Sequence, residues 1–394
     1  MQAIRGRWAV AAVFFVNGAI MGAWAPQIPL LLPRHHITEG VVGLLILGLG
    51  LGAVGAMLFA GRLIAALGSR RMVLVFGLLS APMLPLVVLA PSLWLLAPAM
   101  VLMGAVVGTM DVSMNANAVE AERRLGRAIM SSSHGFWSLG GFAGGALGGL
   151  ALARFGAGTQ ALGVSLAALI IVPLAARFMV TEARAPVAKS RVKAPLLPRS
   201  AAVYVLGFMA LFSIVPEGAV LDWAALYLTK ELAAAPEVSG LAYALNAGAM
   251  AGMRFAGDSM RNRFGAVATL RASGLVAATG ITIAAFAPAA WVAIAGFALC
   301  GLGAANMVPI MFSAAGNHPG LSPGAGLASV TMIGYCGILV APSIIGFIAE
   351  HAGFRLTFAA TAVLLLVVSA AAGRAKAADG RADVAVELPL ETGI

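Results

Sequence analysis

The sequence predicts an all-α polytopic membrane protein, with twelve transmembrane helices in two pseudo-symmetric six-helix halves. Three observations predict this fold class: a composition too apolar for a soluble domain, a series of long apolar runs, and a segment that repeats at half the chain length. Of the 394 residues, 61% are hydrophobic and 10% are charged, whereas soluble domains carry about 25% charged residues. Despite a net charge of +10, this composition excludes a soluble enzyme, a nucleic-acid-binding domain and a disordered protein.

The apolar runs give the elements in chain order. A helix needs about 20 apolar residues to cross a bilayer. A closed barrel would need alternating apolar and polar residues, which these runs lack, so each run is expected to be a helix. We expect the spans at 8–32, 40–66, 72–90, 93–119, 128–153, 159–180, 200–229, 239–260, 266–287, 291–315, 322–349 and 354–373.

The connections between the spans predict the orientation. With the N-terminus in the cytoplasm, 20 Lys and Arg residues fall in cytoplasmic segments and 4 in outer segments. Since cytoplasmic loops are enriched in Lys and Arg, we expect both termini in the cytoplasm. The longest connection, residues 181–199, separates a half at 1–180 from a half at 200–373. The remaining residues, 374–394, form a polar cytoplasmic tail that we expect to be disordered.

A short repeat supports the division into halves. Residues 52–61 read GAVGAMLFAG and residues 248–257 read GAMAGMRFAG, so six of ten positions are identical at an offset of 196 residues. Both segments lie at the inner end of the second predicted span of their half. We interpret the repeat as the result of a duplication; the alternative is chance similarity between two helices rich in small residues.

Two loops combine glycines with basic residues at matching places in the halves. The loop Gly61–Arg71 begins with Gly61, ends in Arg70 and Arg71, and has Ala65 in its interior. The matching loop of the second half, Gly257–Gly265, carries an acidic residue, Asp258. These loops resemble the signature of the major facilitator superfamily, which usually has an aspartate where Ala65 stands. The resemblance covers essentially the whole chain, and it implies two six-helix halves around a site near the midplane. It also implies that the first loop contributes to a cytoplasmic gate, through Arg62, Arg70 and Arg71.

Three further segments narrow the resemblance. Asp111–Asn115, His134–Gly141 and Gly334–Gly337 are similar to a bacterial branch related to proton-coupled fucose-type sugar porters. This implies a secondary active transporter of the bacterial inner membrane that moves a small polar solute by alternating access, with proton symport. The alternative is a proton-driven antiporter that exports amphipathic or drug-like compounds. The fifth span lacks the proline of the motif that drug antiporters usually carry there, which counts against export.

Four ionisable side chains inside the spans are candidates for proton coupling. A charged side chain at a helix centre costs about 2.5–3.5 kcal/mol on insertion scales, so such residues usually face a cavity and have a function. Glu217 is the first choice, because its neighbours Pro216 and Gly218 predict a broken helix of the kind found at transporter sites. The other candidates are Asp111, Asp222 and His134. For each, the alternative is a purely structural hydrogen bond.

Arg254 and Asp258 lie one helical turn apart near the inner end of the eighth span. We expect an i,i+4 ion pair between them, which is compatible with a role in cytoplasmic gating. A clamp on an anionic substrate is the alternative.

Amide and aromatic side chains in the spans are candidates for the substrate site. Together they suit a neutral hydroxylated solute better than a bare ion, although each alone is more often part of the packing. The candidates are Asn17, Trp24, Asn115, His134, Trp137, Trp223, Asn246, Asn306 and Tyr335.

Other classes of ligand are not expected. No nucleophile–base pair, phosphate-binding loop or metal-ligand spacing stands out, so we expect no enzyme activity, no cofactor and no metal site. Cys300 and Cys336 lie in apolar runs and are expected to be buried thiols. The expected partners are the small-molecule substrate, protons and the lipid bilayer, with no nucleic acid and a monomeric state.

Overall fold

The computed structural model describes residues 2–125, 129–181, 200–316 and 323–379. Within these ranges the chain forms α-helices and short 3-10 helices, and no strand. Two site candidates, Asp258 and Tyr335, lie on described helices, but their side chains lie outside the described part of the structure. The predicted connection at 182–199 and the tail beyond residue 379 also lie outside it.

The first half differs from the predicted spans at two prolines. Pro26 falls in a 3-10 turn that divides the first span, and Pro82 falls in a break that divides the third. Proline lacks the N–H that would continue the helical hydrogen bonds, which accounts for both divisions. The elements are α1 (Gln2–Trp24), η1 (Ala25–Gln27), α2 (Ile28–His35), α3 (Glu39–Leu67), α4 (Ser69–Ser80), α5 (Met83–Val88), α6 (Leu93–Leu125) and α7 (Met130–Phe178).

The second half ends in a 3-10 helix where the sequence predicts the start of a disordered tail. For residues 374–379 that expectation is wrong, because they belong to a segment that packs against α10 and α12. The Asp379 carboxylate accepts a hydrogen bond from the N–H of Ala266. The elements are α8 (Ala201–Glu231), α9 (Pro236–Phe264), α10 (Ala266–Ala285), α11 (Ala290–Ala304), α12 (Met307–Gly316), α13 (Pro323–Ala370) and η2 (Ala371–Asp379).

Four glycines with positive φ stand at matching places in the two halves. Gly156 (φ 80°) divides α7 into two spans, and Gly353 (φ 81°), 197 residues later, divides α13. Gly68 (φ 82°) separates α3 from α4, and Gly265 (φ 81°), again 197 residues later, separates α9 from α10. Residues that carry a Cβ rarely adopt this backbone conformation. The repeated spacing supports a common structural unit for the two halves.

The helices are long and apolar enough for a membrane. By length and composition, nine helical stretches of the described residues can cross one. Two of them, Ser132–Phe178 and Met332–Asp379, contain 47 and 48 residues, and each is divided by one of these glycines. The helix α9, with 29 residues, is not among the nine. Division at these glycines gives eleven stretches, and α9 lies where the remaining span is predicted. The all-helical fold class is confirmed.

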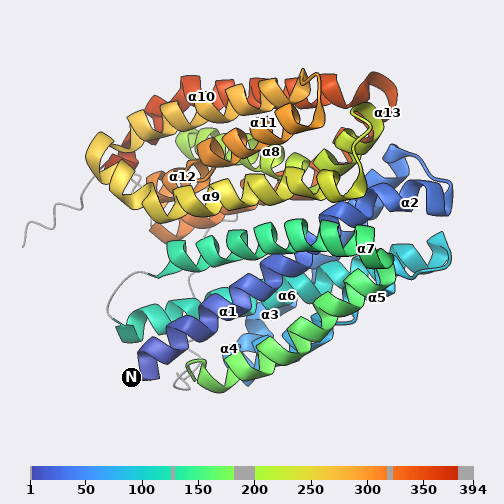
Figure 1. Ribbon diagram of the computed structural model, residues 1–394. Helices are drawn as coiled ribbons and strands as arrows, with labels where there is room; N and C mark the ends of the chain where they lie inside the picture. Colours follow the sequence, from blue (N-terminus) through green and yellow to red (C-terminus); the bar gives the residue numbers. More distant parts are fainter. Residues whose placement is uncertain (1, 126–128, 182–199, 317–322, 380–394) are drawn as a thin grey trace, which may run out of the picture.

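The helices form two groups with a long seam between them. Figure 1 shows α1–α7 on one side of the molecule and α8–α13 on the other. Across the seam, α7 packs against α9 and α3 packs against α13. A Cβ placed on Gly240 of α9 would lie 2.8 Å from the carbonyl oxygen of Gly145 in α7. Small residues therefore let the backbones of the two groups approach closely.

The two ends of the bundle differ in what they contain. The chain begins at the left of Figure 1, where η2 also packs beside the start of α10. We call this the terminal end. The connections α2–α3 and α8–α9 lie at the opposite end, which we call the distal end.

Candidate functional site at the seam between the halves

Arg254 makes a polar contact that joins the two halves. Its Nη1 donates a hydrogen bond to the Ser138 Oγ on α7 at 2.6 Å. Its Nη2 lies 3.5 Å from the Glu217 Oε1 on α8. The side chains of Arg254 and Glu217 are 16% and 27% exposed, so the pair is partly shielded from solvent. One guanidinium thus connects an acid of the second half to a hydroxyl of the first.

The helix that carries Glu217 is not broken, and the expectation of a break there is wrong. The helix α8 runs from Ala201 to Glu231 with Pro216 inside it. Proline is tolerated in membrane helices because neighbouring groups satisfy the freed backbone atoms, and α8 packs closely against α13 and α9. A Cβ placed on Gly218 would meet no atom within 4 Å. Open space therefore adjoins the segment that carries the Glu217 carboxylate.

Three further groups are related to this pair, either directly or through Tyr243. The Tyr243 hydroxyl is close enough to Glu217, Arg254 and Asp222 to interact with their charges. His134 is close enough to interact with the charge of Arg254. The Tyr243 hydroxyl is buried and has no hydrogen-bond partner among the described residues. Asp222 is 7% exposed, and no hydrogen bond or ion pair joins it to another described side chain. A carboxyl buried without a partner is tolerated more easily when it carries a proton.

The amide side chains of Asn17 and Asn246 differ in how many of their hydrogen-bonding atoms already have partners within the protein. The Asn17 Oδ1 accepts a hydrogen bond from the Trp137 Nε1 at 2.9 Å, and the Asn17 Nδ2 donates to the carbonyl of Val107 at 3.4 Å. The Asn246 Nδ2 donates to the carbonyl of Phe297 at 2.7 Å, but its buried Oδ1 has no partner among the described residues. Asn17 and Trp137 therefore hold each other, whereas Asn246 keeps an unused acceptor.

The remaining candidates occupy separate places. The Asn115 Nδ2 donates to the backbone carbonyl of Asp111 within α6 at 2.9 Å. Asn306 packs against Gly257, where an added Cβ would lie 2.1 Å from the Asn306 Oδ1. Trp24 and Trp223 are fully buried, and their indole Nε1 atoms have no partner among the described residues. His134, which lies near Arg254 as described above, also packs edge-on against Phe14, with 5.2 Å between ring centroids.

The residues expected in a cytoplasmic gate do not act as one group in this structure. Arg70 donates to the Thr181 Oγ1 at 3.2 Å, at the start of the long connection, and to the carbonyl of Arg177 in its own half at 3.4 Å. Arg62 and Arg71 are exposed. Arg254 lies in the central contact described above, and its expected partner Asp258 has no described side chain. The expected i,i+4 pair with Asp258 therefore lies outside the described side chains, and the described contacts of Arg254 are with residues on two other helices.

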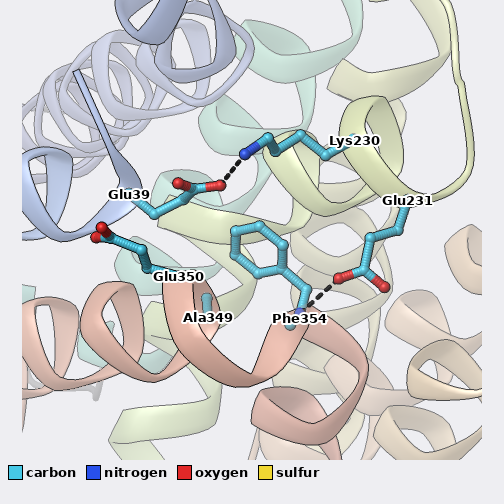
Figure 2. A pocket seen from close by; sticks show the side chains of 7 residues that line it. Glu39, Lys230, Glu231, Ala349, Glu350 and Phe354 are labelled. Atoms are coloured by element: carbon cyan, nitrogen blue, oxygen red, sulfur yellow. Dashed lines mark hydrogen bonds and ion pairs between the residues drawn. The ribbon is translucent and has the colours of Figure 1, made fainter.

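The distal end contains contacts between the halves that the sequence analysis missed. Figure 2 shows the Lys230 ammonium of α8 paired with the Glu39 carboxylate of α3. The N–H of Gly40 donates to the Glu350 carboxylate of α13 at 2.9 Å, which lowers the pKa of that carboxyl below its usual range. The signal for the first contact was present: opposite charges stand at the distal ends of two predicted spans.

These distal contacts surround a shallow pocket. It has a volume of about 300 Å³ and lies between α3, α8 and α13 (Figure 2). Beneath it, a Cβ placed on Gly346 would lie 2.6 Å from the carbonyl oxygen of Glu39. The halves are therefore in close contact at the distal end. The residues that line the pocket are Glu39, Lys230, Glu231, Ala349, Glu350, Gly353 and Phe354.

Comparison with known families agrees with the fold. A model of the Major Facilitator Superfamily matches residues 10–322 and 206–385. An MFS-type transporter of Yersinia pestis, described as uncharacterized, is 37% identical over 91% of this chain and 93% of its own. The membrane protein MosC of Rhizobium meliloti is 35% identical over 88% of this chain and 84% of its own.

Solved structures share the same architecture at low identity. A mutant of the nucleoside transporter NupG has a TM-score of 0.74 and 11% identity, and the match covers 94% of this chain and 99% of NupG. The human organic anion transporter MFSD10 has a TM-score of 0.68 and 14% identity over 94% of this chain and 99% of its own. These similarities establish the fold.

Proposed function

The chain belongs to the major facilitator superfamily, and from this premise we propose that it is a proton-coupled symporter for a small polar solute, sugar-like or a related metabolite. It would work by alternating access in the bacterial inner membrane. The observation that carries the proposal is the contact of Arg254 with Glu217 in one half and Ser138 in the other.

Protonation of Glu217 would change this contact directly. Removing one partner of a partly buried ion pair leaves the other charge poorly compensated, which costs several kcal/mol when the pair is fully buried. Arg254 would then need another acceptor, and a hydroxyl group of the solute is a suitable one. Binding of the proton and of the solute would thereby favour each other, as symport requires.

Unused polar groups of α9, the helix that carries Arg254, support a hydroxylated solute. The Tyr243 hydroxyl can donate and accept, the Asn246 Oδ1 can accept, and both are without partners among the described residues. Arg254 uses only part of its five N–H donors in the two contacts. Such a set of directional donors and acceptors matches the edge of a polyol more closely than it matches a lipophilic cation.

The arrangement of the chain supports the proposed orientation. Both described chain ends lie at the terminal end of the bundle (Figure 1). Among the described connections, those at this end carry several arginines, such as Arg70, Arg71, Arg261 and Arg263. We therefore place the terminal end in the cytoplasm. The distal end, which is closed here, would face the periplasm, and the monomer would be the transporting unit.

Proteoliposomes with an imposed proton gradient test the proposal. A panel of sugars, polyols and nucleosides is first screened by thermal shift, since a ligand at about 100 times its Kd stabilises by roughly 2.7 kcal/mol. With the solute identified, Glu217→Gln is expected to abolish proton-driven accumulation of the solute against its own concentration gradient. The variant is expected to retain exchange of solute across the membrane without net proton movement. Glu237→Gln, at the distal start of α9, is the matched control. Full concentrative uptake by Glu217→Gln would remove Glu217 from the coupling mechanism.

A further inference from the structure

An apolar groove lies on the outer face of the first half, away from the central site. It has a volume of about 360 Å³ and all of its lining residues are apolar. It runs between α1 and both spans of α7, near the terminal end. Trp8, at its mouth, is 55% exposed. The residues that line the groove are Trp8, Ala11, Ala12, Phe15, Phe136, Leu139 and Ile171.

Two arginines stand at the mouth of the groove. The Arg7 guanidinium carbon lies 5.2 Å from the centroid of the Trp8 ring, a cation–π contact. Arg5 is exposed and stands three residues before Trp8, so it lies on the face of α1 that Trp8, Ala12 and Phe15 continue into the groove. Apolar walls below a pair of cations match a molecule with a hydrocarbon chain and an anionic head.

We propose that this groove is a binding site for a phospholipid with an anionic head group, whose acyl chain lies between α1 and α7 and whose phosphate pairs with Arg5 and Arg7. Helices of this length and hydropathy are surrounded by acyl chains. Tryptophan prefers the level of the head groups, and each basic residue near an anionic membrane surface contributes about 1 kcal/mol of attraction.

The groove borders the seam between the halves. Phe136 contacts Trp8 with 5.9 Å between ring centroids and Phe255 of α9 with 6.0 Å. A Cβ placed on Gly135 would lie 2.7 Å from the Phe255 ring. The acyl chain would therefore lie one side chain away from a contact between the two halves.

Photo-cross-linking in phosphatidylcholine nanodiscs tests the site. Two probes carry the same photoactivatable acyl chain, one on phosphatidylglycerol and one on phosphatidylcholine. The phosphatidylglycerol probe is expected to label the groove residues severalfold more than the phosphatidylcholine probe. Arg7→Gln is expected to lower this ratio severalfold, and the double change Arg5→Gln with Arg7→Gln is expected to bring it close to one. Ala12→Trp is expected to suppress groove labelling by both probes while the melting temperature is retained.

Arg263→Gln is the matched control. Arg263 also lies at the terminal end and packs over an aromatic ring, that of Phe264, at 5.3 Å, but it does not line the groove. This variant is expected to keep the full preference for phosphatidylglycerol. Equal labelling by the two probes in the unaltered protein, or an equal loss of preference in Arg7→Gln and Arg263→Gln, would overturn the proposal in favour of general charge attraction.

Discussion

The hydroxyl of Tyr243 on α9 lies against Gly141 of α7, in space that the side chain of any other residue at position 141 would occupy. A Cβ placed on Gly141 of α7 would lie 2.7 Å from this oxygen, and the other close atoms also belong to the Tyr243 ring. The conflict is with the end of a side chain and not with backbone, so substitution would shift Tyr243 without separating the helices. The position of this hydroxyl relative to Arg254 and Glu217 therefore depends on the size of one residue in the other half.

Gly141→Ala is accordingly expected to weaken solute binding more than stability. The displaced Tyr243 hydroxyl should raise the Kd about tenfold, while the change of Gly to Ala in a helix offsets part of the strain by up to about 1 kcal/mol. Gly163→Ala in the same helix, where an added Cβ meets nothing within 4 Å, should leave the Kd unchanged. Isothermal titration and thermal melting of both variants separate the two effects, and equal Kd values would contradict the role given to Gly141.

Individual elements were predictable where local rules determine them. The positions of all twelve spans follow from the apolar runs, and the chain reverses at Gly156 and Gly353 where the runs predict a connection. The prediction failed at Pro216, because packing against neighbouring helices keeps α8 continuous. The prediction also failed for η2. Residues 374–379 contain only small apolar side chains between charged ones, so the sequence alone does not show that other helices of the fold pack against them.

The segment η2 is expected to stabilise the start of α10. Asp379 accepts a hydrogen bond from the Ala266 N–H, one of the backbone donors that a helix start leaves unpaired. Replacement of a capping acceptor by alanine costs about 1 kcal/mol, so Asp379→Ala should lower the melting temperature measurably. Asp379→Asn keeps an acceptor oxygen and should lose much less. Identical melting curves for the two variants would show that the hydrogen bond does not contribute.

At the scale of the whole molecule, sequence and structure provide different kinds of information. The repeat at 52–61 and 248–257 predicts two similar halves, and the structure shows them as two groups of helices (Figure 1). The contact of Arg254 with Ser138 was not predictable, because the two residues lie 116 positions apart in the chain and no periodicity relates them. For Lys230 and Glu39 the sequence shows opposite charges at the distal ends of two predicted spans, but only the structure shows that these two spans meet.

The distal contact between the halves gives a prediction for the conformational equilibrium. Lys230→Glu places two carboxylates together where Lys230 and Glu39 now pair, which should favour separation of α3 from α8 and α13. The Lys230 side chain is 49% exposed and that of Glu39 is 9% exposed. A pair open to solvent on one side contributes about 1 kcal/mol, which corresponds to about a fivefold change in population. In a background without native cysteines, a cysteine at Ser343, which contacts Gly43 across the seam, should react correspondingly faster with an impermeant thiol reagent.

The exchanged pair Glu39→Lys with Lys230→Glu should restore slow labelling, because attraction returns with the opposite polarity. If the exchanged pair labels as fast as Lys230→Glu alone, the charges do not hold this end closed, and the close packing of Gly43 and Gly346 is the stronger determinant.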